Sequence, residues 1–163
     1  MSEIERRVAD QDCGALISKD SVHRYLLWRV WDRHLPLILF VGLNPSTADA
    51  TKDDPTIRRC IGYSRGWKYG GLLMGNLFAY RATLPAALKF AIDPIGPENE
   101  NWLLAANWLA ETTIACWGNH GAHLNQDGRV GIKLLRRHAL AVTKSGQPAH
   151  PLYMRKNLSP IAY

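Results

Sequence analysis

The feature that most constrains the fold is the unbroken apolar run LILFV at residues 37–41, which ends at Gly42. A strand that is apolar at every position is typical of a parallel sheet with helices on both faces. Glycine allows the backbone to turn sharply, and Pro45 favours an extended conformation for Asn44. The sequence therefore predicts that Asn44 lies at the carboxyl end of a central strand, where open α/β sheets bind ligands.

A helix from residue 55 to about residue 65 is predicted to follow this strand. Pro55 is preceded by two aspartates, and acidic residues before a proline are typical of a helix start. The nearby carboxylates would then cap the helix and pair with Arg58 or Arg59. The alternative is that they bind Mg²⁺ beside a phosphate. The three carboxylates concerned are Asp49, Asp53 and Asp54.

Strands and helices alternate along the rest of the chain. The apolar residues 25–31 predict a strand that pairs with residues 37–41 as a hairpin. Further strands are predicted at residues 15–18, 72–80, 112–117 and 139–142, and further helices at residues 84–89, 100–110 and 129–137. We therefore expect an α/β fold, as a three-layer sandwich with a central, mostly parallel sheet of four to six strands.

The length of the chain, 163 residues, suits one domain with a full core. The apolar fraction of 47% and the charged fraction of 21% are those of an ordinary globular protein. We expect a single domain over residues 1–163, with its core at about residues 24–153 and peripheral terminal segments.

The formal net charge of +6 and the isoelectric point of about 9.4 favour an anionic partner, with nucleic acid the first candidate. The alternative is a modestly basic protein without such a partner. The three cysteines form no CxxC pair, which favours reduced thiols in an intracellular setting. No apolar run approaches the ~20 residues of a membrane span, and the charged N-terminus lacks the apolar core of a signal peptide. We expect a cytoplasmic protein without a membrane partner.

Polar loops follow four of the predicted strands. In a parallel sheet these loops gather at one edge, which is the reason to expect a site there. Asn76 interrupts an otherwise apolar run, and a buried amide either bonds to the backbone or reads a ligand. The loops carry Asn44 with Ser46 and Thr47, Asn76 with Tyr80, Asn119, and the stretch from Lys144 to His150.

Cys116, His120 and His123 lie close together in the sequence, and a CxxxHxxH pattern could supply zinc ligands. A fourth ligand is not evident, and the same segment suits an ordinary strand end and loop. We therefore expect no metal and no other cofactor.

Four stretches carry a resemblance to a known family: GLNPSTADATKDDPTIRRC, NLFAYRAT, CWGNHG and TKSGQPAHPLY. Through them the chain from about residue 24 to residue 153 resembles the bacterial and phage domain-of-unknown-function family 1643. This resemblance is specific and covers most of the chain, but it brings no established activity.

Four short motifs also resemble those of the uracil-DNA glycosylase superfamily, and they occur in the same order. They are a G-x-D/N-P motif at Gly42-Leu43-Asn44-Pro45, an apolar strand that ends near Asn76, a W-G pair at Trp117-Gly118, and an H-P pair at His150-Pro151. The resemblance implies a glycosylase-like sandwich. It also implies that Asn44 positions the attacking water, that Asn76 reads the base edge and that His150 stabilises negative charge on the departing base.

These implied roles suit the chemistry, because cleavage of an N-glycosidic bond makes a cationic sugar and an anionic base. The target base would be flipped out of the stack, so that an amide can pair with its edge. Substrate contacts are then expected from Gly42, Leu43, Pro45, Ser46, Thr47, Asn76, Tyr80 and Asn119. Phosphate contacts are expected from Arg58, Arg59, Lys144 and Ser145.

We therefore expect a base glycosylase or a related base-processing hydrolase that acts on nucleic acid, with DNA favoured, or on a nucleotide. Two departures from the superfamily pattern favour an alternative, a non-catalytic nucleotide or nucleic-acid binding module. Asn44 stands where the fastest members carry a carboxylate, and Leu152-Tyr153 follows the H-P pair in place of Ser-Pro. A metal-dependent phosphate-handling enzyme that uses the three aspartates is a further alternative.

Overall fold

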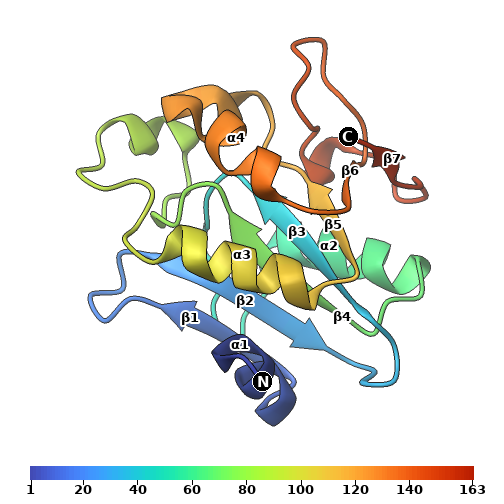
Figure 1. The fold of residues 1–163 in the computed structure, drawn as a ribbon. Coiled ribbons are helices and arrows are strands. Elements are labelled where there is room, and N and C mark those ends of the chain that lie inside the picture. The colour runs from blue at the N-terminus through green and yellow to red at the C-terminus, as the bar shows by residue number, and fades with distance from the viewer.

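The computed structural model describes all of residues 1–163 and contains one seven-stranded sheet (Figure 1). The strands are β1 (Cys13–Ile17), β2 (Arg24–Val30), β3 (Leu37–Gly42), β4 (Gly71–Asn76), β5 (Thr112–Ala115), β6 (Arg137–Ala139) and β7 (Ile161–Ala162). Their order in the sheet is β1-β2-β4-β3-β5-β6-β7. The pairs β3–β4, β3–β5 and β5–β6 are parallel, and the pairs β1–β2, β2–β4 and β6–β7 are antiparallel.

The predicted α/β class is confirmed, but the prediction of a mostly parallel sheet of four to six strands is wrong. The sheet is mixed because antiparallel strands flank the parallel centre on both sides. A strand that is buried on both faces is apolar throughout, whichever way its neighbours run, so its composition does not report their direction. The finer prediction of a glycosylase-like three-layer sandwich stays a prediction.

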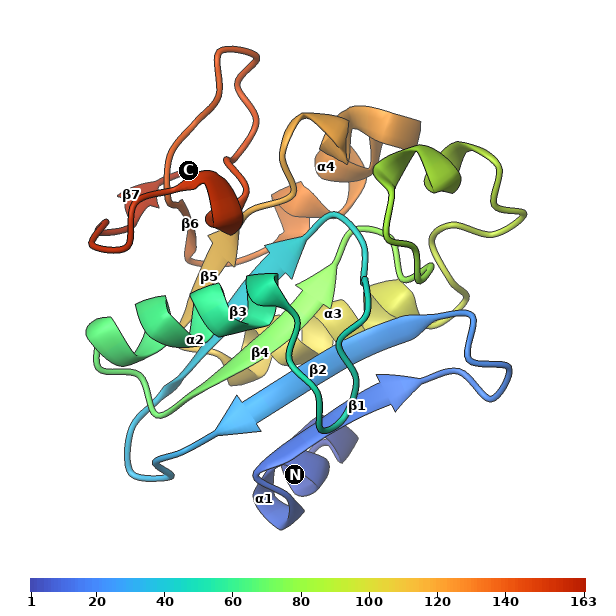
Figure 2. The same cartoon turned by 180° about the vertical axis from the view of Figure 1, so that it is seen from behind.

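Helices cover both faces of the sheet. The face seen in Figure 1 carries α3 (Asn99–Leu109), with α1 (Glu3–Asp10) beside it. The opposite face, seen in Figure 2, carries α2 (Pro55–Gly66). The remaining helical segments are short: α4 (Gln126–Arg129) and 3-10 turns at Pro85–Lys89, Asn119–Asn125, Gly131–Lys133 and Pro151–Tyr153.

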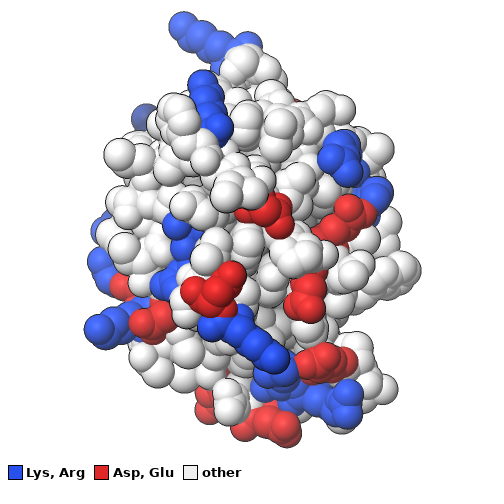
Figure 3. All heavy atoms as spheres, turned by 90° about the vertical axis from the view of Figure 1, so that its left-hand side faces the viewer, with Lys and Arg blue, Asp and Glu red and all other residues white.

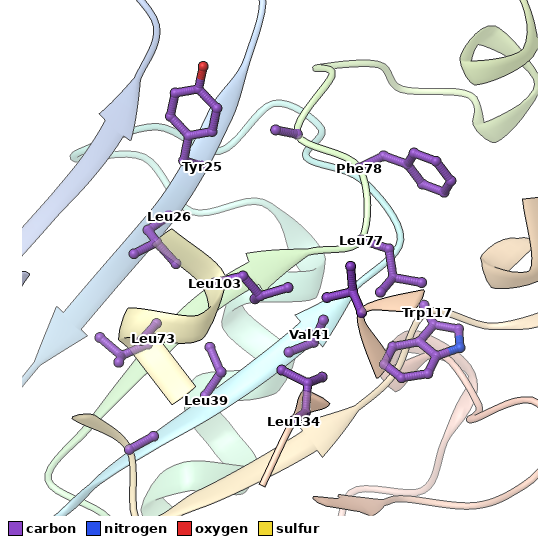
Figure 4. Close-up of a cluster of buried hydrophobic side chains, with 14 of the residues drawn as sticks. Tyr25, Leu26, Leu39, Val41, Leu73, Leu77, Phe78, Leu103, Trp117 and Leu134 are labelled. Atoms are coloured by element: carbon purple, nitrogen blue, oxygen red, sulfur yellow. The ribbon is translucent and has the colours of Figure 1, made fainter. Parts of the chain in front are cut away.

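Each face of the sheet has its own apolar core. The larger cluster packs Leu103 of α3 against Leu39 and Val41 of β3 (Figure 4). The smaller cluster lies on the other face, where Ile57 of α2 packs with Phe40. Consecutive residues of β3 thus belong to different clusters, as side chains that alternate along a strand must. The predicted burial of this strand on both faces is confirmed.

The start of α2 also follows the sequence prediction. Asp54 is the N-cap, and its Oδ1 accepts a hydrogen bond from the Ile57 N–H at 2.9 Å. This bond satisfies one of the backbone donors that a helix start leaves unpaired. Asp53 turns the other way and pairs with Arg29 of β2, with Nε and Oδ1 2.9 Å apart.

β2 and β3 do not form the predicted hairpin, because β4 lies between them. Two glycines at the start of β4 permit this insertion. A Cβ atom on Gly70 would lie 1.9 Å from the carbonyl oxygen of Asp32, and one on Gly71 would lie 2.8 Å from that of Arg29. Only glycine allows the backbone of another strand to approach so closely.

The predicted helix at residues 129–137 and the predicted strand at residues 139–142 are also wrong. α4 ends at Arg129, and β6 already begins at Arg137. Arg136 has a φ of 50°, in the left-handed region that cannot continue a right-handed helix. Residues 134–136 therefore link the short 3-10 segment at Gly131–Lys133 to the strand.

Candidate functional site

A pocket of about 720 Å³ opens at the carboxyl ends of β3 and β4. Its wall also includes the residues after β5, the first turn of α2 and part of the segment from residue 143 to residue 154. This is the edge of the sheet at which the sequence predicts that polar loops gather. The side chains of its wall that can carry charge or read a base are Arg24, Asn44, Asp54, Asn76, Asn119, His120 and His150.

Asn76, the last residue of β4, is the most unusual of these side chains. It is only 1% exposed, yet neither its Oδ1 nor its Nδ2 has a hydrogen-bond partner in the protein. Leaving a buried polar atom unpaired costs about 1–3 kcal/mol, so nearly all buried amides in proteins are paired. An unpaired amide that lines a pocket therefore points to a ligand that supplies the missing partners.

The neighbouring backbone holds Asn76 in this position. In the parallel pair of β3 and β4, Gly42 lies beside Asn76, and a Cβ atom at residue 42 would lie 2.8 Å from the Asn76 Oδ1. From the other face, the Asn99 amide donates to the Asn76 carbonyl at 3.0 Å. The strand end is thus fixed from two sides, while the Asn76 side chain stays unpaired.

Arg24 reaches the pocket because β2 runs antiparallel to β4, which places the first residue of β2 near the carboxyl end of β4. Its Nη1 donates to the carbonyl of Ala48 at 2.7 Å, and its Nε has no partner. The residue is 2% exposed. Burial lowers the pKa of Arg24 to about 10, against the opposing effect of the Asp54 carboxylate. The side chain is therefore a buried cation at neutral pH.

Asp54 is the only carboxylate in the pocket wall. One of its oxygens caps α2 through the Ile57 N–H, so the side chain is held in a defined orientation. Its negative charge favours the protonated forms of Arg24 and His150. It therefore raises the pKa of each, against the larger lowering that burial causes. Asp54 therefore combines a helix cap with a place in the pocket.

His150 is oriented by the backbone that follows it. Its Nδ1 accepts a hydrogen bond from the Leu152 N–H at 3.3 Å, which places the proton of the neutral ring on Nε2. Burial lowers the pKa of His150, while the Asp54 carboxylate acts in the opposite direction. Near neutral pH the residue is thus an uncharged imidazole that can donate through Nε2.

Asn44 lies in the loop after β3, and its Nδ2 is already engaged. It donates to the carbonyl of Ala82 at 2.8 Å and to that of Pro45 at 3.1 Å. These bonds join two loops that border the pocket. They also orient the amide, whose oxygen remains available to accept a hydrogen bond from water.

The loop after β5 is anchored to the segment that follows β6. Asn119 Oδ1 accepts hydrogen bonds from Thr143 Oγ1 at 2.7 Å and from Ser145 Oγ at 2.8 Å. The Trp117 Nε1 donates to Gln147 Oε1 at 2.8 Å. The amide oxygen of Asn119, for which a substrate contact is predicted, is therefore used within the protein.

The structure brings most of the predicted site residues together. Asn44, His150, Gly42, Leu43, Ser46, Thr47, Asn76 and Asn119 all line the pocket. The residues that lie outside its wall are Pro45, Tyr80, Arg58, Arg59, Lys144 and Ser145.

The predicted phosphate contacts therefore lie around the pocket and not within it. Arg58 and Lys144 are exposed and Arg59 is half-buried. Arg58 donates to the carbonyl oxygen of Asp53 at 2.7 Å, so the predicted pairing of the Asp53 carboxylate with Arg58 or Arg59 is wrong. Arg29 takes that place because β2 lies beside the loop that precedes α2.

No group of three or more His, Cys, Asp or Glu side chains in the structure could hold a metal ion. The proposed zinc pattern does not close, because Cys116 is fully buried while His123 packs against the ring of Phe78. Asp49 is used within its own turn, where Oδ1 accepts from the N–H groups of Thr51 and Lys52. The side chains named in the two metal alternatives are therefore not gathered into a ligand cluster in this structure.

The surface charge is spread rather than concentrated on the face drawn in Figure 3, where basic and acidic side chains are interspersed. The net charge of +6 therefore forms no continuous basic patch on that face. None of the helices has the length and apolar character that crossing a membrane requires.

Sequence reasoning missed Arg24 as a pocket residue and took Asp54 as a cap or a metal ligand. The signal for Arg24 was a cation directly before an apolar strand, where burial demands a partner. Its place in the pocket depends on the antiparallel pairing of β2 with β4, which no local pattern encodes. Asp54 was visible as a cap, but its second role depends on the approach of residues 149–154.

One family model matches the chain over residues 24–152, which is most of the length of the chain. The matched range begins at Arg24. No curated protein and no solved structure matches the chain. The pocket described above is built almost entirely from residues within the matched range. The chain belongs to the family described as protein of unknown function (DUF1643).

Proposed function

We propose that the protein binds a nucleobase, in nucleic acid or in a nucleotide, and hydrolyses its N-glycosidic bond. The observation that carries this proposal is the buried, unpaired amide of Asn76 at the pocket wall. A carboxamide offers one donor group next to one acceptor, and the edge of a nucleobase offers the complementary pair. A volume of about 720 Å³ lies within the range of small-molecule sites.

The order of the short motifs supports the same proposal. The residues that resemble uracil-DNA glycosylase motifs, Asn44, Asn76 and His150, all lie in the wall of one pocket although they are far apart in the sequence. The proposed architecture is accordingly a glycosylase-like sandwich. The net charge of +6 would favour a nucleic-acid substrate, with Arg58, Arg59 and Lys144 on the phosphates.

The proposed reaction uses three side chains of the pocket. A water oriented by the amide oxygen of Asn44 attacks the anomeric carbon and gives its proton to Asp54. The N-glycosidic bond breaks, and its electron pair leaves with the base. Neutral His150 donates a hydrogen bond through Nε2 to the base oxygen on which negative charge develops.

The direct test is the formation of abasic sites on single- and double-stranded DNA that carries damaged or hypermodified bases, together with base release from nucleotides. Asp54→Asn is the informative variant, because asparagine caps helices as well as aspartate does. We expect it to keep the helix cap, to lose some stability because the buried Arg24 cation loses a nearby negative charge, and to lose turnover by at least about a hundredfold. Unchanged turnover would remove Asp54 from the mechanism, and no base release from any substrate by the folded protein would contradict the proposed hydrolysis.

Asn76→Asp tests the reading of the base. The change replaces a donor by an acceptor at neutral pH, so the variant should accept a different base, with a change in discrimination of about 1–3 kcal/mol. Calorimetric titration of the wild type and the variant with each free base measures this. A loss of affinity for all bases in equal proportion would argue against base reading by this amide.

A second candidate function is a binding module without catalysis. The engaged Nδ2 of Asn44 favours it, because this amide already joins two loops and so has a structural role without any reaction. Saturable binding of a base without release from any nucleotide or DNA would support this module and reject the hydrolase.

A further inference from the structure

Arg24 is the only arginine or lysine of the pocket wall, and it is a buried charge without a hydrogen-bonded carboxylate partner. None of the four ion pairs of the protein includes it. Its guanidinium group carries five N–H donors, and the protein accepts one hydrogen bond from it, at the Ala48 carbonyl. The Nε is fully enclosed and has no acceptor.

Another arginine of the same strand shows what a satisfied guanidinium looks like in this protein. Arg29 is also buried, and its Nε donates to the Asp53 carboxylate at 2.9 Å. Its other nitrogens donate to the carbonyls of Trp28 and Asp49, each at 2.8 Å. Arg29 does not line the pocket, whereas Arg24 does. The arginine with unused donors is thus the one that a ligand can reach.

Charges around Arg24 do not replace a direct partner. Asp54 and Asp49 are near enough to stabilise the cation, and Arg81 and Arg29 are near enough to destabilise it. A buried charge normally has a hydrogen-bonded counterion, because burial without one costs several kcal/mol. Guanidinium binds oxyanions best, through two parallel N–H bonds.

We propose that the ligand of this pocket carries an anionic group, a carboxylate or a phosphate, that Arg24 binds. This inference rests on the proposed nucleobase pocket and narrows its ligand to an acidic base or a nucleotide. Asn76 reads the base edge, and Arg24 holds the anion attached to the base or to its sugar. The ligand thereby supplies acceptors to Arg24 and both an acceptor and a donor to Asn76.

Matched pairs of probes test the inference on the full-length protein. Orotate and uracil differ by one carboxylate, and uridine monophosphate and uridine differ by one phosphate. Calorimetric titration should show the anionic member of at least one pair binding about tenfold more tightly, since a hydrogen bond to a charged group is worth this much. The pair that shows the preference identifies whether the anion lies on the base or on the sugar.

Variants of the two arginines assign the preference to its residue. Arg24→Met removes the charge but keeps an apolar side chain of similar length, and the anionic preference should fall to near one. Arg24→Lys keeps the charge but loses the fork of donors, and should retain part of the preference. Arg29→Met is the matched control from the same strand, which should lower the melting temperature and leave the preference unchanged. If Arg24→Met does not fold, a reduced anionic preference in Arg24→Lys supports the assignment to Arg24, and an unchanged preference contradicts it.

The outcomes separate this inference from the function on which it rests. Equal affinity for both members of each pair, with binding that depends on Asn76, would overturn the anion and leave the base pocket standing. Suppose instead that inorganic phosphate or acetate binds in a way that depends on Arg24, and that an attached base adds no affinity. This result would support the anion site and overturn the nucleobase pocket. No binding of any probe by the folded protein would overturn both.

Discussion

Asn76 and Asn107 are the same residue type at the same burial, 1% exposed, and they have opposite surroundings. Asn107, near the end of α3, donates to Thr113 Oγ1 at 2.7 Å and to the Leu135 carbonyl at 3.2 Å, and accepts from the Leu135 N–H at 3.1 Å. The side chain of Asn76, at the end of β4, makes no hydrogen bond within the protein. Burial alone therefore does not separate a structural amide from a binding one; the set of partners does.

The largest effect expected from this comparison is on stability at Asn107. Replacement by alanine leaves the partly buried N–H of Leu135 without its acceptor and the buried Thr113 Oγ1 without its donor, and it removes the side-chain bonds that help to hold α3 to the segment before β6. We expect a loss of about 3 kcal/mol in the free energy of unfolding, with base affinity unchanged. Chemical denaturation with the linear extrapolation measures the first quantity and calorimetric titration the second. A fall in affinity beyond that explained by unfolding would show that the two amides are coupled.

Asn76→Leu should lower base affinity and leave the stability nearly unchanged, the reverse of the change at Asn107. The substitution removes two buried polar atoms that have no partner in the free protein, so the stability should change by less than about 1 kcal/mol or rise. Base affinity should fall by at least about tenfold if Asn76 reads the base edge as proposed, because its amide is gone. The same two measurements apply. A loss of stability as large as that at Asn107 would mean that Asn76 is structural after all.

Gly42→Ala disturbs the position of the Asn76 side chain without replacing that residue. The added methyl group would lie 2.8 Å from the Asn76 Oδ1 and 2.9 Å from the Met74 Cε, so one of these flexible side-chain ends must move. We expect a stability loss below about 1 kcal/mol and a severalfold loss of base affinity. Gly62→Ala in α2 is the control, since nothing lies within 4 Å of the added atom there. Equal affinity in both variants would indicate that the ligand does not contact Asn76.

The smallest effect expected is on the pH dependence of stability, through His150. Burial lowers its pKa in the folded protein, whereas the unfolded chain takes up the proton near the ordinary value of about 6.5. As the pH falls through that value, the unfolded state binds more protons than the folded state, so stability falls until the pH reaches the folded pKa. Above about pH 6.5 the contribution is constant. Denaturation midpoints at pH 5 to 7.5 should show a weaker slope in His150→Gln than in the wild type.

The parts of the fold that sequence reasoning predicted are those with local signals. The strand at residues 37–41 is apolar without interruption, and Asp54 with Pro55 marks the helix start; both are confirmed. The order of the strands is a long-range property, and the hairpin of β2 with β3 was wrong because Gly70 and Gly71 admit β4 between them.

The residues of the candidate site also fall into those with a local signal in the sequence and those whose position depends on strand pairing. Asn44 follows β3, Asn76 ends β4 and His150 precedes a proline, so their placement at the sheet edge could be anticipated from the parallel core. Arg24 could not, because its position depends on the direction of β2. Lys144 was expected to contact phosphates beside the pocket; it lies outside the pocket wall, and its contact with phosphate stays a prediction.

The spread of the pocket along the chain, from Arg24 to Met154, has a thermodynamic consequence. Its wall forms only when strands that are distant in sequence have paired, so no fragment that lacks β2 or the segment after β6 can contain it. A ligand of such a site binds the native state alone, and at a concentration of about one hundred times its dissociation constant it adds about 2.7 kcal/mol to the stability of the whole chain. Melting-temperature screening of intact protein against acidic nucleobases and nucleotides is therefore a sensitive way to search for the natural ligand.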